Sequence, residues 1–455
     1  TADLNSVNVG TATLSSLEAN VNVSGEFKLG TTTAKGDIDF NIENVAALNL
    51  GAITSSTGNA SVIISSATGA VTLGTVSATK GNVTLNAGNA LGAVTLGNIT
   101  GDIVSVDLGG VLGAINGTSG NKVSITSNEV VYVGSEISKN VVEITAVAGG
   151  TDLNAQMIGG ANAADSLTLI GKADTQSITA SGDLSGGTLA LTLTEAIKLN
   201  SIDISGLKGI KGDVAINLSA AVQNNKTDVS VQGSDANEQI TYAAPASLTE
   251  VKISGDLGAG VNSITITPDT AAATLTSIDL SGLSATGGTL TSTITLNAAN
   301  TAANISIKGS LGGDTITVKG ENKAVAIDLG KDTAVDTVNV SAVKIADKST
   351  DSKIAEDLVS ITNALSGDKI TLTGVTAIAN RGEITGDTLV AALAKLGEAG
   401  NGTVVAATAE VFVWNGNTYV VDTVGTSLAN DDLIVKLTGI VTFSDTVDAN
   451  TITVA

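Results

Sequence analysis

The sequence contains no cysteine and no histidine among its 455 residues. Without cysteine there is no disulfide framework, no thiolate zinc site and no cysteine nucleophile, and without histidine there is no histidine-based triad. Arginine occurs once, at Arg381, and 22 basic residues face 44 acidic ones, which gives a net charge of −22. We therefore expect no nucleic-acid partner, because binding phosphates requires clustered lysine and arginine side chains.

Bulky and rigid residues are also scarce. Aromatic residues make up only 2% of the chain, and the two prolines are Pro245 and Pro268. Hydrophobic residues nevertheless reach 42%, and there are 52 glycines. The core must therefore be aliphatic, and many tight turns can adopt positive φ, which favours β-solenoids or β-sandwiches over an irregular enzyme core.

Long hydrophobic runs are absent as well. No apolar segment approaches the roughly 20 residues that a membrane-spanning helix needs. The N-terminus has no basic stretch followed by a hydrophobic one. We therefore expect no transmembrane segment, and any export signal should be of another kind.

A short repeat runs through the first quarter of the chain. The segments ALNLG, AVTLG and AVTLG begin at residues 47, 70 and 93, a spacing of 23 residues. A second series of glycine-bearing segments begins at residues 36, 58, 81 and 101. A unit of two short strands cannot bury its apolar face alone, but stacked units form a continuous core. We predict a β-solenoid of about four coils over residues 24–115, with a small β-sandwich as the alternative.

A longer repeat follows. The segment SIDISGL at residue 201 returns as SIDLSGL at residue 277. The strands alternate apolar residues with threonine or serine, which places the hydroxyl groups on an outer face. We interpret residues 126–345 as duplicated β units of about 75 residues. The β repeats of the chain as a whole are expected to be solenoid-like and sandwich-like.

Helical patterns are confined to one region. Residues 351–365 and 387–396 each group their large apolar side chains at helical spacing. The predicted fold is therefore mainly all-β, with four regions. These are a β-solenoid-like region (1–125), duplicated β units (126–345), a mixed α/β connector (346–400) and a C-terminal β module (401–455).

Motifs for catalysis are missing, and we predict that the protein is not an enzyme. No nucleophile elbow, Walker A loop or dinucleotide fingerprint is present. Asp37 and Asp39 could act as an acid/base pair, but their spacing on a strand favours a shared solvent face.

Calcium is the one cofactor that the sequence suggests. Gly312–Val318 (GGDTITV) resembles half of a nonapeptide calcium repeat, and hard cations take oxygen ligands at glycine-rich turns. Four aspartates stand at similar positions at the starts of predicted strands. The candidate calcium ligands are Asp165, Asp235, Asp314 and Asp368.

The last 45 residues carry the most recognisable pattern. Phe412–Val421 (FVWNGNTYVV) reads as a hairpin turning at Asn415–Gly416, and Asp431–Gly439 (DDLIVKLTG) as a further strand. This order resembles the carboxyl terminus of bacterial surface-layer and RTX-type proteins exported by type I secretion. The acidic, cysteine-free body, rich in threonine, alanine and glycine, resembles the Campylobacter surface-array proteins.

The resemblance implies an extracellular location on the bacterial surface, an uncleaved C-terminal export signal and assembly into a two-dimensional lattice, often with calcium. It also implies binding to lipopolysaccharide through an N-terminal region. This chain has no helical anchoring segment like that of the family, so we expect lipopolysaccharide binding to reside in a region absent from these residues.

Three functions follow as hypotheses. The first is a subunit of a surface layer (S-layer) that associates with itself into a lattice. The alternative is a secreted RTX-type adhesin that binds a host or carbohydrate surface. A solenoid enzyme such as a polysaccharide lyase is a third, but one arginine and no histidine leave few residues to stabilise a uronate.

Overall fold

The computed structural model consists of 60% β-strand and 3% helix, which confirms a mainly all-β fold. The chain divides into two compact units: unit 1 (Thr1–Ala221 and Gln232–Glu238) and unit 2 (Val222–Val231 and Gln239–Ala455). The residues that the structure describes are 6–9, 12–108, 111, 115–117, 122–127, 129–133, 141–146, 152–158, 165–194, 198–245, 247–268, 274–296, 304–320, 324–398, 403–423 and 432–455.

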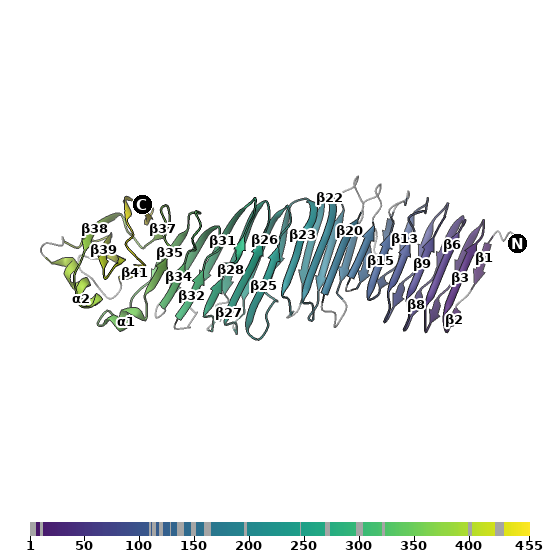
Figure 1. Cartoon of the computed structure of the whole chain (residues 1–455), viewed down its shortest axis with the longest axis horizontal. Helices are drawn as coiled ribbons and strands as arrows, with labels where there is room; N and C mark the ends of the chain where they lie inside the picture. The colour runs from purple at the N-terminus through teal and green to yellow at the C-terminus, as the bar shows by residue number, and fades with distance from the viewer. Residues whose placement is uncertain are drawn as a thin grey trace. The chain divides into compact units, whose positions relative to one another are not determined.

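Unit 1 is a parallel β-solenoid, and its strands lie side by side (Figure 1). Each of the first coils contributes one strand to each of three sheets, here called A, B and C. Sheet A contains β1 (Ser6–Val9), β4 (Glu26–Leu29), β7 (Ala47–Leu50), β10 (Val71–Leu73), β13 (Val94–Leu96) and β16 (Ile115–Gly117). Sheet B contains β2 (Ala12–Leu14), β5 (Thr32–Ala34), β8 (Ile53–Ser55), β11 (Val76–Ala78), β14 (Ile99–Thr100), β17 (Lys122–Thr126), β19 (Val141–Thr145) and β21 (Ser166–Gly171). Sheet C contains β3 (Leu17–Asn22), β6 (Ile38–Glu43), β9 (Ala60–Ile64), β12 (Val83–Asn86), β15 (Ile103–Asp107), β18 (Glu129–Val133), β20 (Asp152–Ile158) and β23 (Ser201–Ile210).

The long strand β22 (Ser177–Leu193) serves two sheets. Its first part pairs with β20 in sheet C, and its last part pairs with β21 in sheet B. Positive φ angles at Gly182, Ser185 and Gly186 mark the turn between the two parts. The last strand of unit 1 is β24 (Asp213–Asn217).

The 23-residue repeat is the stacking period of the coils. Leu73 pairs in register with Leu50 on one side and with Leu96 on the other, and each is only 1% exposed. The solenoid predicted for this region is therefore confirmed, with these leucines forming one inward column. The glycine after each leucine is required because the turns lie directly on one another. A Cβ atom at Gly74 would lie 2.6 Å from the carbonyl carbon of Gly51.

Unit 2 is a parallel solenoid with two principal strands per coil, which form sheets here called D and E. Within unit 2, the strands of the region predicted as duplicated β units stack coil on coil. Sheet D contains β25 (Lys226–Gln232), β27 (Glu250–Asp256), β29 (Ser277–Asp279), β32 (Asn304–Lys308), β34 (Ala324–Asp328) and β36 (Val359–Thr362), with β30 (Leu283–Ser284) beside the end of β27. Sheet E contains β26 (Asn237–Ala244), β28 (Val261–Pro268), β31 (Thr289–Leu296), β33 (Gly313–Gly320), β35 (Thr337–Val343) and β37 (Lys369–Thr371).

The last part of unit 2 covers the final coil. In sheet D, β41 (Leu433–Leu437) pairs with β36 in parallel, and β40 (Asn417–Thr423) and β39 (Thr408–Trp414) add to it as antiparallel strands. In sheet E, β43 (Thr451–Val454) pairs antiparallel with β37. These pairings satisfy strand edges that would otherwise be open for aggregation. The elements of this C-terminal cap are α1 (Asp351–Ala355), β38 (Ala377–Glu383), α2 (Leu389–Ala394), the 3-10 helix η1 (Lys395–Gly397), β39 (Thr408–Trp414), β40 (Asn417–Thr423), β41 (Leu433–Leu437), β42 (Phe443–Asp448) and β43 (Thr451–Val454).

The predicted hairpin is confirmed. Strands β39 and β40 pair antiparallel around Asn415 and Gly416, whose φ angles are 46° and 71° as a type I′ turn requires. The further strand is also present, as β41, although Asp431 of the predicted segment lies outside the described residues.

The predicted helix over residues 351–365 is correct only in its first turn. The helix starts at the cap residue Thr350, whose hydroxyl accepts the N–H of Lys353, and ends at Ala355. Val359–Thr362 instead forms β36, because its alternating, β-branched residues pair with β34. The second helix, α2, lies within the predicted 387–396, and both helices fit a short connector. In the part of the chain that the structure describes, no helix is long and apolar enough to cross a membrane.

Candidate functional site

Two of the four predicted calcium ligands belong to one column of buried aspartates in sheet E. The N–H of Asp314 donates to Oδ1 of Asp336 at 2.8 Å, and the N–H of Asp336 donates to Oδ1 of Asp368 at 2.9 Å. The other oxygen of Asp368 accepts the N–H of Leu365 at 2.7 Å. We call Asp314, Asp336 and Asp368 the aspartate ladder. Asp336, its central member, was not among the sequence candidates.

The first rung of the ladder is held by serines. The carboxylate of Asp314 accepts hydrogen bonds from the hydroxyl of Ser292 in the preceding coil and from the N–H and hydroxyl of Ser310. Each ladder residue stands just before or at the start of its strand, where the chain turns into sheet E. The aspartate side chains therefore accept hydrogen bonds from N–H groups of the turns, which have no carbonyl partner on a neighbouring strand.

The ladder is electrostatically strained. Burial raises the pKa of Asp336 to about 8, and the carboxylates of Asp314 and Asp368 act in the same direction. Burial likewise raises the pKa of Asp314 to about 6, against the hydrogen bonds from the serines. The nearby Asp332 contributes to both shifts, and its Oδ2 is buried with no hydrogen-bond partner. Near neutral pH Asp336 therefore retains a proton that exposed aspartates lose.

The other two predicted ligands lie in unit 1. Asp165 is 1% exposed, and its backbone pairs with Leu184 and Thr188 at the start of β21. Burial of Tyr132 is the largest cause that raises the pKa of this tyrosine, and the charge of Asp165 is the second. Asp235 is exposed in a turn, close to the buried Glu238.

Calcium stays a prediction at these positions. Among the residues that the structure describes, no three His, Cys, Asp or Glu side chains are grouped so as to hold a metal ion. The ladder oxygens instead accept backbone N–H groups along the stack.

Unit 1 has an exposed column with the same hydrogen-bond pattern, made of one aspartate and two asparagines. Oδ1 of Asp37 accepts the N–H of Asn59 at 2.7 Å, and Oδ1 of Asn59 accepts the N–H of Asn82 at 2.9 Å. The neighbouring Asp39 projects from β6 and is only partly buried. An asparagine can therefore accept the N–H of the next coil as an aspartate does, and it does so without a charge.

The outer surfaces of two sheets carry rows of hydroxyl groups. In sheet B, one in-register row comprises Thr33, Thr54, Ser77, Thr100, Thr126 and Thr145. In sheet E, a second row comprises Thr241, Thr265, Thr293, Thr315 and Thr337. Each row repeats once per coil, so both faces are uncharged along these lines.

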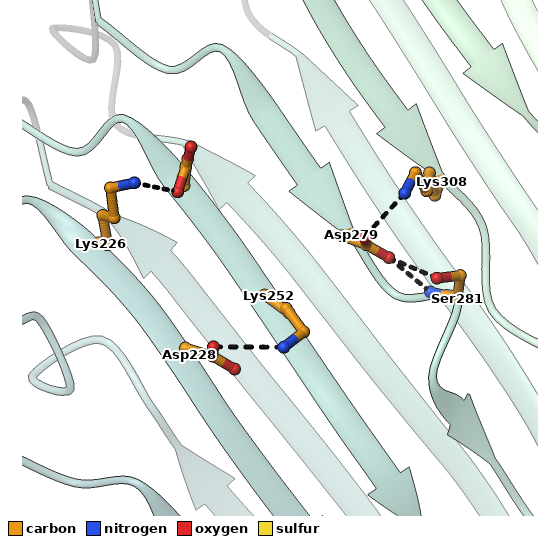
Figure 2. A network of polar contacts seen from close by, with 7 residues as sticks. Lys226, Asp228, Lys252, Asp279, Ser281 and Lys308 are labelled. Carbon is orange, nitrogen blue, oxygen red and sulfur yellow. Dashed lines mark hydrogen bonds and ion pairs between the residues drawn. The ribbon is translucent and has the colours of Figure 1, made fainter.

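The outer surface of sheet D carries charges in strict alternation. Asp228 pairs in register with Lys252, Lys252 with Asp279, Asp279 with Lys308, and Lys308 with Asp328. Figure 2 shows the ion pairs within this charged row, at 3.2 Å for Lys252–Asp228 and 3.1 Å for Lys308–Asp279.

Within the charged row, the side chain of Asp279 is held in place by hydrogen bonds from the turn that follows it. Asp279 accepts the N–H of Ser281 at 3.0 Å and its hydroxyl at 2.6 Å (Figure 2). Burial acts to raise the pKa of Asp279, but the hydrogen bonds from Ser281 and Lys308 outweigh it, and the pKa is lowered. Asp279 therefore remains charged, and its position is set by the turn.

The C-terminal cap has its own small core and one buried ion pair. Phe412 and Tyr419 stack with their ring centroids 5.5 Å apart, and Trp414 packs edge-on against Tyr419. Arg381 forms a forked pair with Glu410, with Nε–Oε2 at 2.5 Å and Nη2–Oε1 at 3.0 Å. Glu410 is fully buried, so the single arginine of the chain neutralises it.

No known protein family and no curated protein sequence matches this chain.

Proposed function

We propose that the protein is a structural, non-catalytic subunit of a bacterial surface layer, in which copies of the chain associate side by side into a two-dimensional lattice. The observation that carries the proposal is the pair of hydroxyl rows on sheets B and E. Short hydroxyl side chains lose little conformational entropy on contact, and each group can both donate and accept a hydrogen bond. A flat face of this kind can therefore pack against a like face.

The net charge of −22 bears on the same proposal. Like-charged copies repel until counterions screen them, and divalent cations do so most effectively. In this proposal calcium bridges exposed carboxylates on neighbouring copies and promotes assembly.

Export and anchoring complete the proposal. The C-terminal cap contains the segment that resembles a type I secretion signal, and it carries the chain to the cell surface. Attachment to lipopolysaccharide is assigned to a region outside these residues.

The test is electron microscopy of the purified protein at high concentration, with millimolar calcium and with a chelator. We expect ordered sheets with calcium and dispersed particles without it. The alternative, an RTX-type adhesin, predicts particles that stay monomeric in both conditions. Monomers at high concentration in calcium would remove the support for a lattice subunit.

A further inference from the structure

The charged row on sheet D differs from the rest of the surface. In the whole chain acidic residues outnumber basic ones two to one, with 44 against 22. Along the charged row the signs alternate over five consecutive coils, from Asp228 to Asp328. Two copies of a protein with a charge of −22 can approach most closely where their charges balance locally.

The surface beside the charged row is flat over its later coils. Two residues before Asp279, Lys308 and Asp328 stand the small side chains of Ser277, Ser306 and Ala326, and Ser360 follows them in register. Two residues before Asp228 and Lys252 stand Lys226 and Glu250, which form an exposed ion pair at 2.5 Å. The short side chains let a second sheet approach, and they leave room for the longer Lys226 and Glu250 side chains of that copy.

The alternation makes the row complementary to itself in one arrangement. Consider a second copy whose sheet D faces sheet D of the first, related to it by a two-fold axis that is parallel to the strands and passes midway between Lys252 and Asp279. The coils of the second copy are then stacked in the opposite order to those of the first. Asp228 then faces Lys308 of the second copy, and Lys252 faces Asp279 of the second copy. With the symmetric equivalents this gives four ion pairs between copies and no contact between like charges in the row.

We propose that the outer surface of sheet D is an isologous contact between two copies of this chain, with its register set by the pairs Asp228–Lys308 and Lys252–Asp279. Within one copy, Lys252 pairs with Asp228 and Lys308 pairs with Asp279. These pairs are exposed, with side chains 24–67% accessible, so they contribute little to folding. Between copies each ion gains a second partner of opposite sign, and a network is stronger than isolated pairs. The inference rests on the proposed self-association and names one of its contacts.

Complementary charge reversals test the contact. In Lys308→Glu, the new glutamate faces Asp228 at both symmetric positions, and in Asp228→Lys, the new lysine faces Lys308. We expect each variant alone to dimerise at least about tenfold more weakly than wild type in sedimentation experiments at low salt. An equimolar mixture of the two should regain the wild-type affinity, because each unlike pair is restored.

A cross-link tests the register independently. Because the chain has no cysteine, Ser277→Cys introduces a single reporter. In the proposed dimer the two copies of residue 277 lie one coil apart along the stack, about 5 Å, on sheets that face each other across about 10 Å, so a short bis-maleimide should join the two thiols. The matched control Ser360→Cys places its two thiols seven coils apart, about 34 Å, and should not cross-link.

The outcomes separate this contact from the lattice proposal. Melting temperatures within a few degrees of wild type establish that the variants fold. If the charge-reversed variants associate like wild type, if their mixture does not recover, or if residue 360 cross-links as well as residue 277, the contact is wrong. Ordered sheets formed equally by wild type and variants would overturn the contact but leave the surface-layer proposal in place. A wild-type chain that never self-associates overturns both.

Discussion

The N–H of Asp314 donates to the carboxylate of Asp336 across 22 residues of sequence, at 2.8 Å, inside a column of buried acids. Such a column stabilises the stack through hydrogen bonds to otherwise unsatisfied N–H groups. It also destabilises the stack when the buried carboxyls ionise, since neighbouring rungs then carry like charges.

The first prediction concerns pH. The pKa of Asp336 is raised to about 8 and that of Asp314 to about 6, so the folded state keeps protons that the unfolded state loses above about 4. The contribution of these groups is fully present below pH 4 and is lost as the pH rises to about 8. We expect Asp336→Asn to unfold at a higher temperature than wild type at pH 8.5, because asparagine keeps the acceptor without the charge.

The measurement is the melting temperature between pH 5 and pH 9. The exposed Asp228→Asn serves as the matched control and should follow the wild-type curve. A decline with pH in Asp336→Asn as steep as that of wild type would show that the ladder does not titrate as described.

The second prediction concerns the leucine column. In Leu73→Asp, an unpaired carboxylate enters the aliphatic stack between Leu50 and Leu96, which should cost several kcal/mol. Thr72→Asp, one residue earlier on the outer face, should stay within about 0.5 kcal/mol of wild type. Urea unfolding of both variants measures the difference. Equal stabilities would contradict the assignment of the two faces.

The third prediction concerns the arginine pair in the C-terminal cap. Removing the guanidinium in Arg381→Met leaves Glu410 buried and charged, which should cost about 3–5 kcal/mol. Adding Glu410→Gln should recover most of that loss, because the uncompensated charge disappears. Thermal unfolding of the single and double variants tests this, and additive losses would argue against a coupled pair.

The fourth prediction concerns the C-terminal strands. Deleting Phe412–Ala455 removes β41 and β43, which pair with β36 and β37. The exposed strand edges should make the truncated chain aggregate, whereas the full chain stays dispersed in the absence of calcium. Size-exclusion chromatography distinguishes these outcomes. A soluble, monomeric truncated chain would show that the edges need no cover, and it could then be used to ask whether the deletion also blocks export.

Several features could be predicted from the sequence because they depend on local or strictly periodic patterns. The leucines at positions 50, 73 and 96 recur at a constant interval, so stacking coils of equal length must bring them together. Asn415–Gly416 requires positive φ at both positions, which only a tight hairpin turn supplies.

The charged row and the aspartate ladder were decided by tertiary structure. Their members are separated by unequal intervals, such as 24 residues from Asp228 to Lys252 and 29 from Asp279 to Lys308. Turns of different length stand between the strands, so no constant period marks which side chains will face one another. The same reason explains Asp336, which resembles any exposed aspartate in sequence, and Val359–Thr362, whose strand character appears only when β34 lies beside it. Sequence specifies which residues point inward, whereas the register of the stacked coils specifies which residues meet.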